Sequence, residues 1–211
     1  MTLYNEAYKK ILDAIVSGKF KPGQLLKELE LSAELKMSRT PIREALARLE
    51  RDGLLVKMGR SYMVAYLTKE DVEALYEVRI PLEVAAAKAA APKAPEHALR
   101  QLEETIDALL RESCAASPDP FRLAELSGAF HDLIAEAAGN AYLYEELRRL
   151  KLRLKPARVR IFLDVRRRLQ EAQEHKAVFE AIRSRDPSRA GRAMEDHEDS
   201  VMKYIREVLL R

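Results

Sequence analysis

The 211-residue sequence contains one cysteine, Cys114, and it lacks any apolar run that approaches the roughly 20 residues of a membrane-spanning helix. A single cysteine excludes an intrachain disulfide, and nothing else in the sequence calls for an oxidising compartment. The first six residues lack the charged-then-apolar layout of a secretory signal peptide. These absences predict a cytoplasmic protein with no membrane partner.

Hydrophobic residues make up 47% of the chain and charged residues 34%, as is typical of a globular protein. Runs with the composition of β-strands end near residue 67, and helical periodicity follows. We therefore predict a mainly α fold with two domains, a smaller one over residues 1–67 and an all-helical one over residues 68–211.

A short amphipathic helix in the N-terminal domain begins with arginines. In this segment Thr40 is a suitable N-cap, and Pro41 at the first helical position has its φ angle preset for a helix. Apolar residues then recur with helical spacing at Ile42, Ala45, Leu46 and Leu49. With one side buried and Arg39 and Arg43 at its exposed start, such a helix can enter the major groove of DNA, where arginine binds phosphate or guanine.

The flanking segments complete a winged helix-turn-helix. Residues 25–35 predict a second helix, joined to the first by a short turn. The β-prone runs 54–58 and 61–66 predict a hairpin, with Gly59 in the positive-φ conformation of a tight turn and Arg60 at its tip. An amphipathic segment further upstream supplies the third helix.

The positive charge of the chain is concentrated in this domain. Residues 1–66 hold 12 lysines and arginines against 8 acidic residues, whereas the remainder holds 25 against 26. Such an excess is expected of a module that binds phosphates. Two alternatives stay open, because helix-turn-helix modules can also bind only protein and arginines at helix ends can simply be solvated.

The same stretch resembles a known family. The run GKFKPG at 18–23, the segment SRTPIREALARLERDGLL at 38–55 and the pair Gly59-Arg60 are similar to the N-terminal domain of GntR-family transcriptional regulators. The resemblance implies contacts to double-stranded operator DNA by Ser38, Arg39, Thr40 and Arg43, and by Gly59 and Arg60 in the wing. Lys36 stands where the family usually has glycine, which predicts a strained turn or an additional cation.

The C-terminal domain has the pattern of six helices. Thr68 caps the first, and segments with helical apolar periodicity follow at 69–90, 96–114, 120–138, 141–164, 166–185 and 187–210. The connections between them are short and most contain proline or glycine. This arrangement predicts an antiparallel helical bundle.

Three of the four histidines lie on the apolar sides of three of these helices: His131, His175 and His197. A buried imidazole needs a polar partner. Three converging imidazoles could share one divalent ion and leave coordination positions open. Zinc is the first expectation, and nickel, manganese and iron also accept imidazole. Alternatively, each histidine forms a hydrogen bond with its own neighbour in the core.

The pattern around these histidines, including HKAVFEAI from His175 onward, resembles the FCD domain, the helical effector domain of the FadR subfamily. In many members three histidines and an aspartate bind a metal that helps to hold a small carboxylate effector. The three histidine positions match here. The aspartate would stand one turn before His131, where this chain has Ser127, and the resemblance therefore implies a weaker metal site.

A carboxylate effector would need a cation besides the metal. Arg79 is one candidate, although it could instead form a salt bridge with Glu83 four residues later. Arg158 is another, because it borders the apolar stripe of a segment whose other cations are expected to face solvent. With Ser127, these two arginines form the predicted effector site.

We therefore predict a repressor, not an enzyme, that binds a palindromic operator as a homodimer and is released or modulated by a small organic acid. A homodimer is expected because one helix-turn-helix module reads only a few base pairs. Two alternatives remain. One is a metal-dependent enzyme that uses the three histidines, although no carboxylate has a spacing such as HExxH. The other is a DNA-binding protein without an effector.

Overall fold

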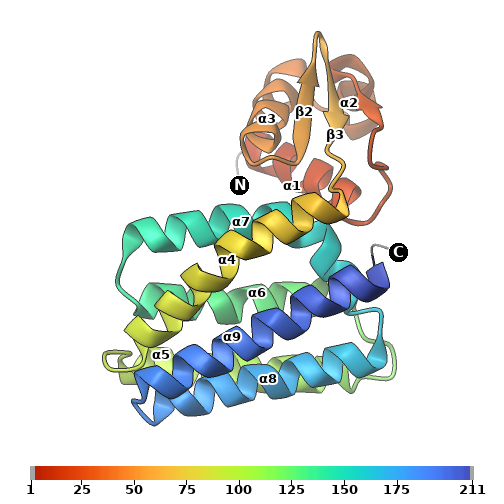
Figure 1. Cartoon of the computed structure of the whole chain (residues 1–211). Coiled ribbons are helices and arrows are strands. Elements are labelled where there is room, and N and C mark those ends of the chain that lie inside the picture. Colours follow the sequence, from red (N-terminus) through yellow and green to blue (C-terminus); the bar gives the residue numbers. More distant parts are fainter. Residues whose placement is uncertain (1–2, 210–211) are drawn as a thin grey trace. The chain divides into compact units, whose positions relative to one another are not determined.

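A computed structural model describes residues 3–209, with the side chains of all of them except residues 156, 208 and 209. The chain forms two compact units that divide between residues 67 and 68. Helices dominate both units, and the mainly α fold class predicted from the sequence is confirmed (Figure 1).

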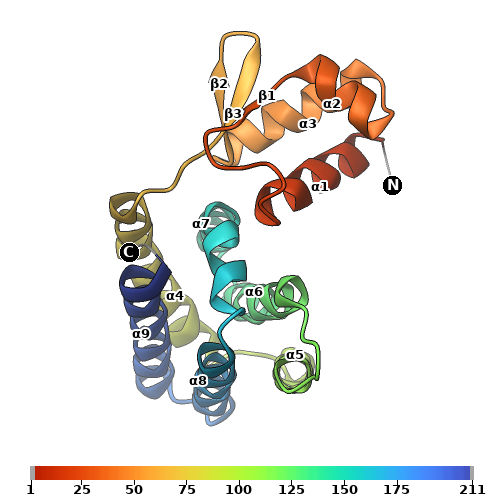
Figure 2. The same ribbon diagram turned by 90° about the vertical axis from the view of Figure 1, so that its right-hand side faces the viewer.

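The N-terminal unit combines helices with a small antiparallel sheet. Its elements are α1 (Leu3–Val16), β1 (Leu25–Leu26), α2 (Glu28–Leu35), α3 (Arg39–Arg51), β2 (Leu55–Met58) and β3 (Ser61–Val64). The strand order is β1–β3–β2, with Leu25 opposite Met63 and Leu55 opposite Val64. The β2–β3 hairpin extends away from α1 (Figure 2), and Gly59 at its turn has the predicted positive φ, 62°.

The apolar stripe predicted for α3 is buried against α1. Its four members are all fully buried, as is Ile11 on α1. Burying a side chain of this size stabilises the fold by about 1.5–3 kcal/mol. This packing fixes the inner side of α3 and leaves the opposite side in solvent.

Two predictions about the ends of these helices are wrong. The N-cap of α3 is Ser38, not Thr40, and Pro41 is the third residue of the helix rather than the first. Proline is tolerated there because the N–H groups of the first turn have no acceptor within the helix. In addition, residues 25–35 do not form one helix, because Leu25–Leu26 pair with β3 and α2 begins only at Glu28.

The turn between α2 and α3 is left-handed at its first residue. Lys36 has φ 53°, a conformation that costs a non-glycine residue energy, and its backbone N–H caps the end of α2. The strained turn expected from lysine in place of glycine is therefore present.

The C-terminal unit contains the six predicted helices, and their ends differ from the prediction by a few residues at most except at the last one. They are α4 (Lys69–Ala90), α5 (Glu96–Ser113), α6 (Pro120–Ala137), α7 (Ala141–Ile161), α8 (Val165–Arg183) and α9 (Pro187–Tyr204). The helix expected to reach residue 210 instead changes to a π-helical turn, η1 (Ile205–Leu209).

Polar caps define where these helices begin. Thr68 and Asp71 form a reciprocal capping box at α4, as predicted for Thr68. The carboxylates of Asp119, Asp164 and Asp186 cap α6, α8 and α9 by accepting backbone N–H groups of the first turn. Because a cap is a local contact, these starts are readable from the sequence.

Helices α4, α6, α8 and α9 share a core. Helix α9 packs against both α4 and α8, and α6 packs against α4, α5 and α7; α8 and α9 run side by side in opposite directions (Figure 1). The core is lined by apolar side chains such as Phe130, Ile134, Val178 and Met194. Along the described residues, no helix is both long and apolar enough to cross a membrane.

Candidate nucleic-acid interface and metal centre

The first turn of α3 presents the predicted DNA contacts to solvent. Ser38 and Thr40 are exposed, and the side chains of Arg39 and Arg43 are 59% and 60% exposed. Gly59 and Arg60 at the hairpin tip are exposed as well. The buried stripe of α3 faces the core while its arginines face outward, so this surface can approach a duplex.

Glu28 holds both of these arginines. The Arg43 Nε atom donates to both Glu28 carboxylate oxygens at 3.1 Å, and Nη2 donates to Oε2 at 3.1 Å. Arg39 Nη2 lies 3.5 Å from the same Oε2. The hydrogen bond from Arg43 lowers the pKa of Glu28. The edge of the Arg43 guanidinium formed by Nε and Nη2 is therefore occupied by Glu28.

Sequence reasoning missed Glu28. It is the first residue of α2 and lies 15 residues before Arg43. No periodicity within a single helix connects two such positions. Only the packing of α2 on α3 brings them together.

A polar cluster ties the C-terminal end of α3 to α1. Tyr8 donates to Asp52 Oδ2 at 2.8 Å, and Arg48 donates to the Tyr4 hydroxyl at 3.1 Å. The Arg48 guanidinium also lies 4.4 Å from the centre of the Tyr8 ring. These contacts orient α3 about its own axis, and thereby set the direction of its exposed arginines.

In the C-terminal unit the three histidines of the bundle converge. His131 on α6, His175 on α8 and His197 on α9 are buried, with ring centres between 4.6 and 5.3 Å apart. One potential ligand atom from each lies within 4.8 Å of the other two. His175 also stacks on Phe130, with ring centres 4.2 Å apart, and this contact fixes its ring plane.

Most ring nitrogens of these histidines have no hydrogen-bond partner among the described residues. Nδ1 of His197 lies 2.8 Å from Glu174 Oε2 and is paired with it, whereas Nδ1 of His131 lies 3.2 Å from Glu83 Oε2 without forming a hydrogen bond. Nδ1 of His175 and Nε2 of all three histidines also have no hydrogen-bond partner in the part of the chain that the structure describes. An unpaired buried polar atom costs about 1–3 kcal/mol. The alternative in which a neighbour satisfies each histidine therefore leaves the three Nε2 atoms unexplained.

Burial lowers the pKa of all three histidines well below the usual value. Each imidazole is therefore neutral near pH 7 and keeps a lone pair on one ring nitrogen. Neutral imidazole is the form that binds a divalent metal. The donor set thus fits an ion such as Zn²⁺.

Arg79 lies inside the bundle, not on its surface. Its Nη2 atom is 3.0 Å from Glu83 Oε1 and 2.9 Å from Glu198 Oε1, and all three side chains are buried. The predicted i, i+4 ion pair with Glu83 is therefore present, and it is buried. Burial raises the pKa of Glu198 to about 7. Arg79 Nη1 has no hydrogen-bond partner within residues 3–209.

Arg158 turns inward from α7, as its position beside the apolar stripe predicts. Its Nη2 donates to Ser127 Oγ at 2.7 Å and pairs with Glu171. Ser127 Oγ in turn donates to Glu171 Oε1 at 2.8 Å. Burial acts to raise the pKa of Glu171, but Arg158 and further neighbours lower it to about 2.

The predicted residues Arg79, Ser127 and Arg158 thus surround the three histidines. Of the carboxylates that accompany them, the sequence indicated only Glu83, as a partner of Arg79, and it did not indicate Glu171, Glu174 or Glu198. One available signal was overlooked, because Glu171 lies one helical turn before His175 and so shares its face of α8.

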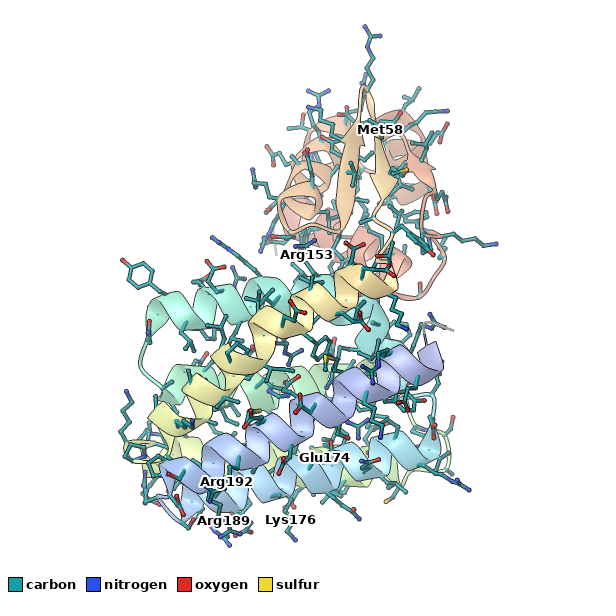
Figure 3. All side chains as sticks on the ribbon, in the orientation of Figure 1. Met58, Arg153, Glu174, Lys176, Arg189 and Arg192 are labelled. Carbon is teal, nitrogen blue, oxygen red and sulfur yellow. The ribbon has the colours of Figure 1, made fainter. Side chains whose placement is uncertain are left out.

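A surface hollow of about 510 Å³ lies beside this centre, lined by residues of α8, α9 and η1. Three of its lining residues, Arg167, Gln170 and Ser200, form hydrogen bonds with Glu174. Glu174 lies where α8 and α9 run side by side (Figure 3). Since Glu174 contacts His197, it connects the hollow with the histidines.

Family comparisons divide the chain in the same way as its structure. The family described as "Bacterial regulatory proteins, gntR family" matches residues 3–63, and the FCD domain matches residues 74–200. Each match falls within one of the two compact units.

Curated relatives and solved structures are similar to the chain over nearly its whole length. The chain is 29% identical over 211 residues to the HTH-type transcriptional regulator YdhC of Bacillus subtilis (strain 168), covering 98% of this chain and 92% of YdhC. It is 26% identical to the HTH-type transcriptional repressor RspR of Escherichia coli (strain K12), covering 96% and 89%. The solved structure of E. coli McbR/YncC has the same fold, with a TM-score of 0.83, 19% identity and 97% of both chains covered.

Proposed function

The chain belongs to the GntR family of bacterial transcriptional regulators and carries an FCD domain, and from this we propose that it represses transcription as a homodimer on a palindromic operator. We place it in the FadR subfamily and assign a small organic acid as its effector. Its family and relatives are transcriptional regulators, so the alternative of a metal-dependent enzyme is set aside.

The observation that carries the proposal is the exposed, arginine-bearing start of α3. Arg39 and Arg43 project from a helix whose other side is buried. In the major groove, the guanidinium of Arg43 would contact base edges, while the hydroxyls of Ser38 and Thr40 would bind phosphates. Gly59 and Arg60 would contact the duplex from the wing. Two copies are needed because one recognition helix reads few base pairs.

In the bundle, His131, His175 and His197 would hold a divalent ion, with Zn²⁺ the first expectation and Ni²⁺, Mn²⁺ or Fe²⁺ the alternatives. Support comes from their three unpartnered Nε2 atoms. Such an ion would supply a fixed positive charge that attracts the carboxylate of an effector.

The effector would also use the two buried arginines. Arg79 and Arg158 each retain an Nη1 atom without a hydrogen-bond partner in the described structure. A carboxylate beside them would accept these N–H groups, with Ser127 close by. To act as a switch, the effector must bind one packing of the bundle more tightly than another and so change the spacing of two recognition helices.

The test is a selection of bound sequences from a random duplex pool with the full chain, followed by Arg43→Ala on the selected site. We expect a two-fold symmetric site and a loss of about 1–3 kcal/mol of operator binding per half-site, because one base-contacting arginine is removed from each half-site. Fluorescence anisotropy measures the loss.

Arg51→Ala is the matched control, since Arg51 is exposed at the far end of the same helix. It removes the same charge but no contact at the start of α3. An asymmetric selected site would contradict the homodimer on a palindrome. Equal effects of the two variants would contradict α3 as the reading element.

A further inference from the structure

The carboxylate of Glu171 faces the same interior as the three histidines. Glu171 is fully buried on α8, one turn before His175, and its Oε1 atom lies 3.9 Å from His175 Nε2. Atoms that bind one zinc ion, each about 2.0–2.2 Å from the metal, stand roughly 3–4 Å from one another. The separation between Glu171 and His175 is therefore close to that of two ligands in one coordination shell. The group of ligand atoms within 4.8 Å of one another holds the three histidines without Glu171, so the carboxylate would move closer to His131 and His197 when an ion binds.

We propose that Glu171 is the fourth, anionic ligand of the metal held by His131, His175 and His197. The inference rests on the metal site of the proposed function and adds a protein ligand to it. The site then has three neutral nitrogen donors and one carboxylate, all of them side chains of the bundle.

Hydrogen bonding leaves one Glu171 oxygen available. Its Oε1 atom accepts from Ser127 and from Arg158, which fixes the direction of the carboxylate. Its Oε2 atom has no hydrogen-bond partner among the residues described, although Arg167 Nη2 lies 3.6 Å away. A ligand oriented by an outer layer of hydrogen bonds is typical of metal sites in proteins.

The other carboxylates of the cluster occupy a different side of the histidines. Glu174 lies against Nδ1 of His197, where it can accept the ring N–H, and Glu83 and Glu198 lie 3.2 Å and 3.7 Å from Nδ1 of His131. The contact with Glu174 holds His197 in the tautomer whose Nε2 carries the lone pair. Glu171 instead approaches the Nε2 atom of His175. A carboxylate beside Nε2 can share a metal with the histidine, whereas a carboxylate beside Nδ1 only orients the ring.

The same geometry accounts for the serine at position 127. Ser127 Oγ lies 2.8 Å from Glu171 Oε1 and donates a hydrogen bond to it. An aspartate at this position would bring a second carboxylate against the first, and like charges at such a distance repel. When Glu171 on α8 supplies the negative charge, the residue at position 127 on α6 must be a hydrogen-bond donor such as serine.

The test titrates the metal-free full chain with Co²⁺, which reports its ligand geometry by visible absorption, while calorimetry gives affinity and stoichiometry. Wild type is expected to bind one ion per chain. Glu171→Gln keeps the size of the side chain but removes the anion, so the affinity should fall more than about tenfold and the Co²⁺ spectrum should change.

Glu180→Gln is the matched control, since Glu180 lies on the same helix and pairs only with Arg183 near the surface. It should bind Co²⁺ like wild type. The exchange variant Ser127→Asp/Glu171→Ser returns a carboxylate to the cluster from α6, and it should recover the affinity to within a few-fold. Circular dichroism establishes whether each variant folds. If Glu171→Gln does not fold, the exchange variant still tests the proposal.

The outcomes separate the two proposals. If wild type and Glu171→Gln bind Co²⁺ with equal affinity and the same spectrum, Glu171 is not a ligand and the three-histidine site stands. If wild type binds no Co²⁺, the metal part of the proposed function fails and this inference fails with it. Failure of the exchange variant to recover affinity would show that a carboxylate from α6 cannot replace Glu171, and would overturn the electrostatic account of Ser127.

Discussion

At the scale of single residues, charged partners decide how the exposed and buried groups of this protein are aimed. Glu28 holds one edge of the Arg43 guanidinium through three contacts of 3.1 Å. Glu171, Ser127 and Arg158 form a comparable arrangement inside the bundle. In both places a carboxylate fixes the orientation of a group that a ligand would contact.

Removing the charge of Glu28 should reduce operator discrimination. Glu28→Gln releases Arg43, so the ratio of operator affinity to random-duplex affinity should fall about tenfold, which is within the 1–3 kcal/mol of a good arginine–guanine contact. Glu30→Gln is the control, because Glu30 is exposed on the same helix and pairs with Lys27. Glu28→Gln and Glu30→Gln each remove one negative charge near the DNA, so their sequence-independent affinity for DNA should rise by the same amount. An equal ratio in both variants, measured by anisotropy, would refute the orienting role of Glu28.

The buried histidines should make the metal-free protein less stable in mild acid. Burial lowers the pKa of His175 in the folded state, so the unfolded chain takes up a proton near pH 6.5 while the folded chain does not. The stability from neutral His175 is thus present above pH 6.5 and is lost as the pH falls below it. Glu198, whose pKa is raised to about 7, acts in the opposite direction.

His175→Gln isolates this contribution. Between pH 6.5 and 5.5, the slope of unfolding free energy against pH should decrease by up to about 1.4 kcal/mol per pH unit relative to wild type. Urea denaturation in the presence of a chelator gives the slope. His97→Gln, at an exposed position on α5, should leave it unchanged. An unaltered slope in His175→Gln would mean that His175 is accessible to protons in the folded protein.

At the scale of elements, the helix starts follow from local capping, and the errors arise where pairing partners are distant. Asp119, Asp164 and Asp186 cap their helices through backbone N–H groups a few residues away. In contrast, Leu25–Leu26 become a strand because β3 lies beside them. The apolar spacing of this segment suits a helix, and only its strand partner overrides it.

Loss of the α8 cap should weaken the bundle. Asp164 accepts from the backbone N–H groups of Arg166 and Arg167 and from the Tyr204 hydroxyl. Asp164→Ala should therefore lower the free energy of unfolding by about 0.5–2 kcal/mol. Asp107→Ala, at an exposed position within α5, should stay within about 0.5 kcal/mol of wild type in the same urea titration. Equal stability of both variants would contradict the capping role.

At the scale of the whole molecule, the two compact units carry different kinds of candidate site. The N-terminal unit bears the excess positive charge and the exposed arginines. The C-terminal unit contains a buried cluster of histidines, arginines and carboxylates. Transcriptional regulation by a ligand requires that an event in the second unit alter DNA binding by the first.

A screen of small organic acids tests this link. An acid that binds the bundle should raise its melting temperature, more so with Zn²⁺ present, because ligand binding to the folded state stabilises it by mass action. The same acid should change operator affinity, and operator DNA should change the affinity for the acid by an equal factor. If no acid shifts the melting temperature, the alternative of a DNA-binding protein without an effector is favoured.

The sequence by itself determined which segments are helical, except at Leu25–Leu26, and also which side of α3 is buried and that three histidines lie on apolar stripes. These features depend on contacts between residues three or four positions apart, and such contacts leave a period in the sequence. Only the tertiary structure decided which charged groups meet. Glu28 and Arg43 are 15 residues apart, and Ser127 and Glu171 are 44 apart. No period marks those pairs, because the packing of one helix on another brings them together.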